Sequence, residues 1–417
     1  MANIVSPDVV VSDASDQQNY TPALVSLAIL YFMMGFITCL NDTLVPFFKE
    51  GFTLTYTESS LVQFYFFLTY GVMSIPAGKI VERVGYKYGM VLGFAVAALG
   101  AFLFFPASIL HQYYLFLAAL FVVAIGIVLL QVAANPYITV LGPAKTASSR
   151  LTLIQGVGSL GTTVAPLFGA YFILAPLQNT NAGSEAVRYP YIGIGLVLLL
   201  IAAVVYFLSL PMISTSEAKA EKASEEGDRK SVFSFRNLNL GAIAIFVYVG
   251  AEVSVGTFLT NYIADLLLIS ESESNAYVAL YWGSMMVGRM LGFFGLKVYK
   301  PSSVLAACAA IAIALICISV NSEGYLAVWS MIAVGLCNSV MFAIIFSLSV
   351  SGLGTYTTRA SGILSTAIAG GAIISFCQGF LIDNFSWTVA FMVPLVCYVY
   401  ILFYGVNGYK SRYSELS

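Results

Sequence analysis

A carboxylate lies inside the first long apolar segment of the chain, in the run Gly35–Pro46 that contains Asn41 and Asp42. An aspartate at the centre of a membrane-spanning helix costs about 2.5 to 3.5 kcal/mol to insert, so such residues tend to face a cavity and to carry a function. The glycine before it and the proline after it would let a helix bend. Asp42 is therefore the first candidate for binding a proton or a cation. The alternative is that it caps the helix or lies at headgroup level.

Six further polar side chains fall in apolar segments: Gln131, Asn135, Gln155, Glu252, Asn338 and Gln378. Each either binds a polar ligand or hydrogen-bonds to a neighbouring helix. Gln131 and Asn135 are four residues apart and share one helical face, where Pro136 frees a backbone carbonyl. Glu252 either takes part in binding or pairs with Arg289 on the next predicted helix, because a lone charge in each helix would be costly.

The composition indicates a membrane protein. The 417 residues are 59% hydrophobic and 9% charged, whereas a soluble domain carries about 25% charged residues. There is no basic cluster that would indicate a nucleic-acid partner. The six cysteines lie in apolar stretches without a CxxC pair, so we interpret them as small buried hydrophobic residues. With His111 as the single histidine, a His-based catalytic or metal site has no basis, and we expect neither an enzyme nor a cofactor.

Segments of about twenty apolar residues can each cross a membrane as a helix, and the chain has room for twelve. Residues 214–236 carry ten charged side chains and are predicted to form a solvated linker between two six-helix halves, 1–213 and 237–417. The predicted helices lie near residues 22–48, 57–79, 88–144 (two helices), 151–184, 189–216, 237–266, 272–298, 301–322, 324–358, 360–382 and 384–409.

The distribution of Lys and Arg predicts the orientation. If the linker faces the cytoplasm, that side holds fifteen of these residues and the opposite side two, so both termini are expected to be cytoplasmic. The halves also repeat one another at an offset of 209 residues, at which Thr146 corresponds to Thr355 and Arg150 to Arg359. Two repeats of six helices joined by a long cytoplasmic linker are the organisation of major facilitator transporters.

Several runs resemble family signatures. Gly78–Lys87, in the loop after the second predicted helix, resembles the signature of the major facilitator superfamily, with Glu82 where aspartate is usual. Gln131–Pro143 resembles the fourth-helix signature of the fucose–galactose–glucose:cation symporter family, and Leu40–Asp42 matches its first-helix motif. Two further runs resemble the glucose/galactose branch of that family, 248–254 and 281–289. The chain is thus identified as a member over almost its whole length.

The resemblance implies an all-α integral membrane protein with the major facilitator fold, in which twelve transmembrane helices form two six-helix halves around a central cavity. It implies import of a hexose of the glucose, galactose or fucose class by cation symport through alternating access, by a monomer in a bacterial inner membrane. In the proton-coupled fucose member, a first-helix aspartate and a fourth-helix glutamate carry protonation and sugar recognition. Asp42 matches the first, whereas the second position holds Gln131, which cannot titrate. Gln155 matches a fifth-helix glutamine that faces the sugar.

A hexose presents adjacent hydroxyls, which carboxylate and amide side chains can bind, and partly apolar faces, which aromatic rings can cover. Asp42 is predicted to carry the coupled proton. A sodium ion at Asp42 is the alternative, because some relatives with a glutamine at the fourth-helix position are sodium-coupled. Transport of an N-acetylated amino sugar on the same scaffold is another alternative. The predicted substrate contacts are Asn41, Asp42, Gln131, Asn135, Gln155, Glu252 and Asn338.

Charged residues near the predicted cytoplasmic loops are expected to form contacts that hold one conformation shut; these are Glu82, Arg83, Arg150 and Arg359. The small-residue runs 156–161 and 369–372 predict close helix packing or sliding surfaces. A membrane enzyme acting on lipids would need a clustered His, a metal motif or a Ser–His pair, and a transport-incompetent sensor would need a signalling domain. The sequence offers neither, so a transporter is the interpretation we adopt.

Overall fold

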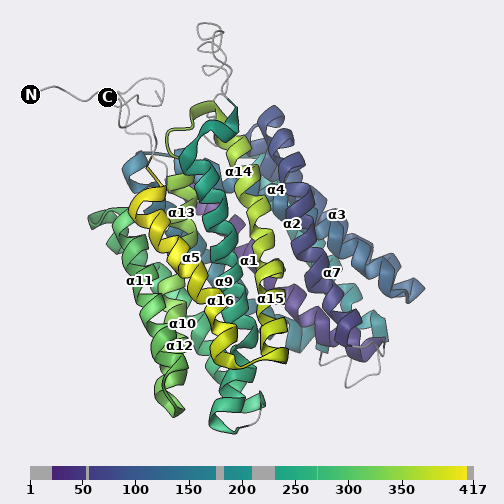
Figure 1. Ribbon diagram of the computed structural model, residues 1–417. Helices are drawn as coiled ribbons and strands as arrows, with labels where there is room; N and C mark the ends of the chain where they lie inside the picture. The colour runs from purple at the N-terminus through teal and green to yellow at the C-terminus, as the bar shows by residue number, and fades with distance from the viewer. Residues whose placement is uncertain (1–20, 53–55, 175–182, 209–230, 270, 411–417) are drawn as a thin grey trace, which may run out of the picture.

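The computed structural model describes residues 21–52, 56–174, 183–208, 231–269 and 271–410. Within these ranges the chain is helical and forms no strand. This agrees with the apolar sequence, because in lipid the backbone groups of a lone segment can only be satisfied inside a helix. The long helices run side by side as one bundle (Figure 1).

Six long helices come from the first half of the chain: α1 (Thr21–Gly51), α2 (Tyr56–Val84), α3 (Tyr86–Leu110), α4 (Tyr113–Val140), α5 (Ala147–Gly169) and α7 (Arg188–Phe207). The second half contributes α9 (Arg236–Leu267), α10 (Glu271–Val298), α11 (Pro301–Val320), α12 (Gly324–Asn338), α13 (Met341–Val350), α14 (Thr357–Thr366), α15 (Gly370–Asn384) and α16 (Trp387–Phe403). α12 with α13, and α14 with α15, each make one span.

Ten of the described segments are long and apolar enough to cross a membrane. The other two long helices, α2 and α10, have 29 and 28 residues, which is also enough to span, although each carries charged residues. Together they make twelve spans in two sets of six, and the predicted all-α fold class is confirmed. The division at the linker stays a prediction, because residues 214–230 lie outside the described part of the chain.

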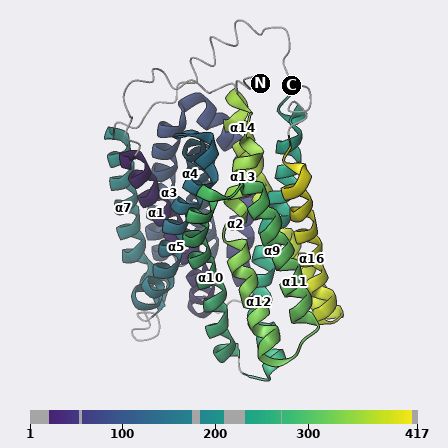
Figure 2. The same cartoon turned by 90° about the vertical axis from the view of Figure 1, so that its left-hand side faces the viewer.

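Each half packs mainly against itself. In the first half α1 packs on α5, and α3 packs on α4 and α7, whereas in the second half α9 packs on α15 and α16, and α11 packs on α12 and α16. The halves meet along two seams, one between α2 and α14 and one between α5 and α10. Figure 2 shows α5 next to α10 along the second seam. We call these the α2–α14 seam and the α5–α10 seam.

One end of the bundle carries the turns that join α2 to α3 at Gly85, α4 to α5 and α13 to α14. We call it the Gly85 end; it is uppermost in Figure 2. Hydrogen bonds between the halves cluster toward it, as in the bond from the Thr358 hydroxyl to the Tyr86 hydroxyl (2.9 Å). The described contacts therefore hold the halves together at this end.

Two spanning helices have interruptions that other side chains satisfy. Pro136 lies inside α4 and removes the bond that the Val132 carbonyl would accept. The Ser361 hydroxyl of the other half donates to that carbonyl (3.1 Å). The sequence prediction that Pro136 frees a carbonyl is therefore met by a contact between the halves.

The second interruption separates α12 from α13 at Ser339 and Val340. The Asn338 carbonyl accepts a hydrogen bond from the Tyr248 hydroxyl (3.0 Å). The Ser339 carbonyl accepts one from the Arg289 Nε atom (3.3 Å). Non-helical backbone at membrane depth is tolerated where protein groups satisfy it in this way.

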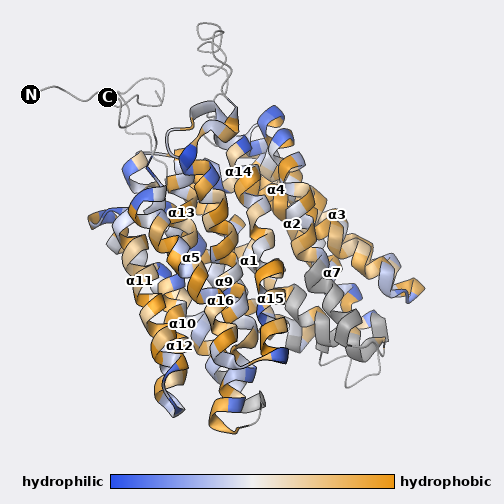
Figure 3. Ribbon diagram, in the orientation of Figure 1, coloured by the Kyte–Doolittle hydropathy of each residue, from blue (hydrophilic) through white to orange (hydrophobic). Residues whose placement is uncertain are grey.

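Many large apolar side chains are exposed on the bundle, and hydrophobic residues run along most of the helices in Figure 3. This corrects the interpretation of the cysteines. Only Cys337 and Cys397 are buried, while Cys317 and Cys377 are exposed on the helix surface. The physical reason is that lipid, unlike water, solvates apolar side chains, so hydropathy alone does not distinguish an outward from an inward residue.

The small-residue runs pack helices closely, both within a half and between the halves. A Cβ atom on Gly161 would lie 2.0 Å from the Phe32 carbonyl oxygen on α1, and one on Gly370 would lie 2.1 Å from the Phe246 oxygen on α9. Gly156 instead faces Met290 across the α5–α10 seam. Gly371 likewise faces Phe67 on α2 of the other half. Close packing is thus confirmed, and each run contacts its own half and the other.

Candidate functional site

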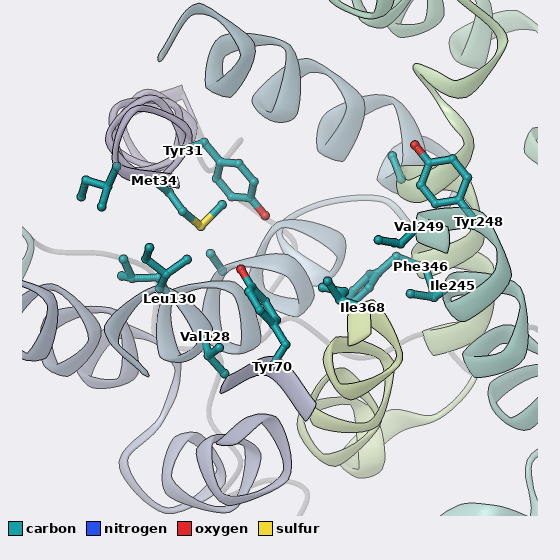
Figure 4. Close-up of a cluster of buried hydrophobic side chains, with 14 of the residues drawn as sticks. Tyr31, Met34, Tyr70, Val128, Leu130, Ile245, Tyr248, Val249, Phe346 and Ile368 are labelled. Atoms are coloured by element: carbon teal, nitrogen blue, oxygen red, sulfur yellow. The ribbon is translucent and has the colours of Figure 1, made fainter. Parts of the chain in front are cut away.

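Asn135 joins α4 to α1 in the first half. The Tyr31 hydroxyl donates a hydrogen bond to the Asn135 Oδ1 atom, and both side chains are buried. Figure 4 shows the Tyr31 ring extending from its helix into the middle of the bundle. Asn135 therefore has a structural partner on the face that it shares with Gln131 one turn earlier.

Gln131 is the amide of the first half whose hydrogen bonding is incomplete. Its side chain hydrogen-bonds with the Tyr70 hydroxyl of α2, but its Oε1 atom is buried and has no partner among the described residues. The hydroxyl ends of Tyr31 and Tyr70 lie close together in Figure 4 and interact electrostatically. A buried unpaired acceptor costs about 1 to 3 kcal/mol. The Gln131 oxygen is thus available to a hydroxyl donor.

Gln155 lies on α5 and is partly exposed. Its carbonyl accepts a hydrogen bond from the Ser159 hydroxyl one turn later (3.2 Å). Ser159 in turn accepts a hydrogen bond from the Arg289 Nη1 atom of the second half. Gln155 is therefore next to the α5–α10 seam, on the side of α5 that faces the other half.

Asn338 has a different environment, because three tyrosines of the second half use its polar groups. Its Nδ2 atom donates to the Tyr281 hydroxyl (3.0 Å), and its Oδ1 atom accepts from the Tyr398 hydroxyl (2.7 Å). Its backbone carbonyl accepts from Tyr248. The side chain is fully buried. In this conformation Asn338 holds the end of α12 to α9, α10 and α16, and both ends of its amide are bonded.

Glu252 and Arg289 lie near one another in the second half. Glu252 on α9 interacts with the Tyr248 side chain and is attracted by the charge of Arg289 on α10. The hydrogen bonds of Arg289, however, go to Ser339 and Ser159. The sequence left open whether Glu252 binds ligand or pairs with Arg289; the structure shows attraction between them and a different set of hydrogen-bond partners.

Asn41 and Asp42 belong to α1, but their side chains lie outside the described residues. Their helical position is described: Asp42 follows Tyr31 by eleven residues, which is about 16 Å along the axis. It also follows the apolar window of α1, Ala23–Leu40, by two residues. Asp42 therefore lies farther from the Gly85 end than the level at which Tyr31 meets Asn135.

The four charged residues near the Gly85 end have different surroundings. The Arg359 Nε atom donates to the Glu82 Oε2 atom at 2.7 Å across the α2–α14 seam. Arg150 donates to the carbonyls of Thr139 (2.9 Å) and Pro143 (2.8 Å), and so binds the end of α4 within its own half. Arg83 is exposed. Of the predicted charge contacts, the described residues thus show one that joins the halves.

Tyr31 and Tyr70 were not among the residues predicted from the sequence. A usable signal existed for Tyr31, because eleven residues make about three helical turns and place it on the same face of α1 as Asp42. Tyr70 carries no such signal, since its relation to Gln131 depends on how α2 packs on α4. Ser159 was likewise hidden in a run of small residues.

Comparison with known proteins places these residues in a family. The family model described as Major Facilitator Superfamily matches residues 27–376. A glucose/galactose transporter of Brucella abortus is 49% identical over 404 residues, which cover 96% of this chain and 97% of the relative. The L-fucose-proton symporter of Escherichia coli is 31% identical over 419 residues, with 94% of each chain covered.

A solved structure agrees with the sequence comparison. The crystal structure of a single-residue variant of the Escherichia coli fucose:proton symporter superposes with a TM-score of 0.82 and 28% identity. The match covers 94% of this chain and 99% of that one. The likeness therefore extends over both halves and the seams between them.

Proposed function

The chain belongs to the Major Facilitator Superfamily, in the family of the glucose/galactose transporters and L-fucose-proton symporters, and on this premise we propose that it imports a hexose together with a proton by alternating access. The relatives are named as transporters, and the protein is a multi-pass membrane protein rather than an enzyme. We propose glucose, galactose or fucose as the cargo, because the relatives' names give these sugars. They do not favour an N-acetylated amino sugar.

The observation that carries the proposed sugar site is the unpaired Gln131 Oε1 atom. A sugar hydroxyl that donates to this oxygen would complete its hydrogen bonding, while Tyr70 beside it can accept or donate. A site with unpaired buried polar groups discriminates strongly in favour of ligands that pair with them. Asn135 holds Tyr31 in place beside Tyr70 and Gln131 through its hydrogen bond to the Tyr31 hydroxyl. Gln155 is the proposed contact from α5, and Glu252 is the proposed contact from the second half.

Asn338, a sugar contact predicted from the sequence, is not part of the proposed sugar site. Its amide is bonded at both ends to tyrosines of its own half, so a sugar would have to displace a hydrogen bond that is already made. We propose instead that Asn338 stabilises the interruption between α12 and α13.

Asp42 is the proposed proton carrier. Gln131 cannot titrate, so in the first half the coupling function falls on Asp42, with Asn41 beside it as the proposed sugar contact. We propose a proton in preference to sodium, because two relatives are named L-fucose-proton symporters. We also propose a monomer in a bacterial inner membrane, with the Gly85 end and both termini on the cytoplasmic side, as the positive-inside rule predicts.

Uptake into proteoliposomes tests the proposal. Radiolabelled glucose, galactose and fucose are supplied separately under an inward pH gradient and under an inward sodium gradient. We expect one or more of these sugars to accumulate under the pH gradient only, and Asp42→Asn to abolish accumulation while sugar exchange at equilibrium persists. Accumulation under the sodium gradient alone would overturn proton coupling, and no uptake of any of the three sugars would overturn the proposed cargo.

A further inference from the structure

Arg289 is a cation inside a spanning helix. It lies on α10, nine residues before the helix ends at Val298, which is about 13 Å along the axis. An arginine at such a depth is costly unless it is paired or hydrogen-bonded, and intramembrane charges mostly serve a function. The proposed sugar site does not use this residue.

The guanidinium of Arg289 holds both halves at once. Its Nε atom donates to the Ser339 carbonyl of its own half, at the interruption between α12 and α13 (3.3 Å). Its Nη1 atom donates to the Ser159 hydroxyl on α5 of the other half. The planar fork of an arginine can make two such bonds in fixed directions. Arg289 is therefore anchored in one half and reaches to the other.

The other described hydrogen bonds between the halves differ in charge or in exposure. Those between neutral groups are Ser148 with Ser347, Ser149 with the Phe293 carbonyl, Thr358 with Tyr86, and Ser361 with the Val132 carbonyl. The remaining charged contact, from Arg359 to Glu82, has its arginine side chain 52% exposed. Among the described residues, Arg289 is thus the charged group that crosses the α5–α10 seam.

Glu252 offers Arg289 a second partner within its own half. It lies on α9 beside Tyr248 and is attracted by the charge of Arg289. Tyr248 donates to the Asn338 carbonyl, so Glu252 and Arg289 both lie beside the same interruption in α12–α13. If α5 moves away from α10, the Arg289 guanidinium loses its hydrogen bond to Ser159. Glu252 stays beside Arg289, because both belong to the second half.

We infer that Arg289 is a positioning residue that holds the α5–α10 seam closed through Ser159, and that Glu252 takes over the guanidinium when the seam opens. This inference rests on the proposed alternating access. A charge that exchanges one buried partner for another is never left unpaired, so the two conformations stay close in free energy. Without Glu252, opening would leave the guanidinium with only the Ser339 carbonyl of its described hydrogen-bond partners, and with no opposite charge beside it.

Two substitutions should act in opposite directions. Ser159→Ala removes the partner of the closed seam without changing any charge, so it should favour opening. Glu252→Gln removes the partner of the open seam, so it should favour closure. If Arg289 served only to stabilise the fold, the two substitutions would shift the equilibrium between open and closed seam in the same direction. The matched control is Thr163→Ala on the same helix, because the Thr163 hydroxyl bonds to the Ser159 carbonyl of its own helix (2.8 Å).

Cysteine accessibility measures the seam directly. Ser148 is buried and bonds to Ser347 of the other half, so a cysteine there reports opening at the Gly85 end. The full-length Ser148→Cys protein in lipid nanodiscs is reacted with a hydrophilic maleimide without sugar. Labelling of residue 148 is followed by peptide mass spectrometry, which separates it from the six native cysteines. Because no substrate is present, the result does not depend on the proposed cargo.

We expect Ser159→Ala to raise the labelling rate at least about fivefold, since hydrogen bonds to charged groups are the strong ones. Glu252→Gln should lower the rate by a similar factor, and Thr163→Ala should match the parent. Arg289→Lys keeps the charge but loses the fork, and should label faster than the parent. Equal rates for Ser159→Ala and the parent would overturn the inference, as would shifts of Ser159→Ala and Glu252→Gln in the same direction.

Discussion

Each half of the molecule places an amide among tyrosines, but only one of the two amides is fully bonded. Asn338 in the second half is bonded at both ends of its side chain, to Tyr281 and to Tyr398. Gln131 in the first half meets Tyr70 but leaves its Oε1 atom without a partner among the described residues. The bonded amide stabilises a helix interruption, whereas the incompletely bonded one has capacity for a ligand.

The difference follows from where the backbone needs support. α12 ends at Asn338, so its last carbonyls need donors. Tyr248 donates to the Asn338 carbonyl, and Arg289 donates to the Ser339 carbonyl that follows it. α4 runs through Gln131 and ends only at Val140, and its freed carbonyl at Val132 is satisfied by Ser361. The backbone of α4 therefore does not need the Gln131 side chain as a hydrogen-bond donor. We therefore propose a stabilising function for Asn338 and a recognition function for Gln131.

The largest effect is expected at Asn338. Asn338→Ala removes two side-chain hydrogen bonds and deprives the buried Tyr398 hydroxyl of its acceptor, while the Tyr281 hydroxyl keeps its bond to the Glu252 carbonyl. This should lower the stability by about 3 kcal/mol or more. The apparent melting temperature of the purified protein measures this loss. Gln131→Ala is the control, and its melting temperature should not fall by a comparable amount. Equal losses in the two variants would break the comparison.

Gln131→Ala should instead reduce transport. Loss of a hydrogen bond to a sugar hydroxyl, together with mispairing of its neighbours, should lower kcat/KM for uptake by about 10- to 100-fold. Initial rates of radiolabelled sugar uptake check this, normalised to the amount of folded protein. Removal of an unpaired buried acceptor should leave the melting temperature unchanged or slightly higher. An uptake rate within twofold of the parent would contradict the assignment.

Tyr31→Phe should have a smaller effect, because it removes one hydroxyl that acts on the site through Asn135. We expect KM for the sugar to rise about three- to tenfold with little change in kcat, as for one hydrogen bond. Concentration series of uptake measure the two parameters separately. Tyr398→Phe, which deletes the matching hydroxyl beside Asn338, is the control and should leave KM unaltered while lowering the melting temperature.

The smallest effect is expected at the exposed ion pair of the α2–α14 seam. Exposed pairs contribute about 0 to 1 kcal/mol and are screened by salt. Arg359→Gln should therefore change sugar exchange by at most about fivefold, and less at high ionic strength. Exchange rates at low and high salt measure this. A large effect that persists at high salt would show that this seam, and not the α5–α10 seam, carries the stronger contact.

The fold and the family could be predicted from the sequence because they depend on repeated, local signals. Apolar length predicts spans, and the runs around Gly78 and Gln131 carry family signatures. The orientation that Lys and Arg indicate stays a prediction. The functions of Gln131 and Asn338 could not be separated in this way. Both are amides in apolar segments, and only the tyrosines contributed by other helices distinguish them.

The contacts of Arg289 were beyond sequence reasoning for a similar reason. The neighbouring helix offered Glu252 as the natural partner, whereas the structure gives hydrogen bonds to Ser159 on the other half and to the Ser339 carbonyl. Neither proline nor glycine marks the interruption at Ser339 and Val340. It depends on Tyr248 and Arg289, which are distant in the sequence. Gln378, also singled out from the sequence, is fully buried and has no partner for its amide among the described residues.

The measurement that tests the central claim most directly is equilibrium binding of radiolabelled glucose, galactose and fucose to purified Gln131→Ala and Asn338→Ala, side by side. It is made at a temperature at which both variants are folded, with the parent protein as reference. The account predicts that Gln131→Ala loses at least about tenfold in affinity while Asn338→Ala binds within about threefold of the parent. Binding lost in Asn338→Ala and retained in Gln131→Ala would contradict it, and would place the sugar site on the second half.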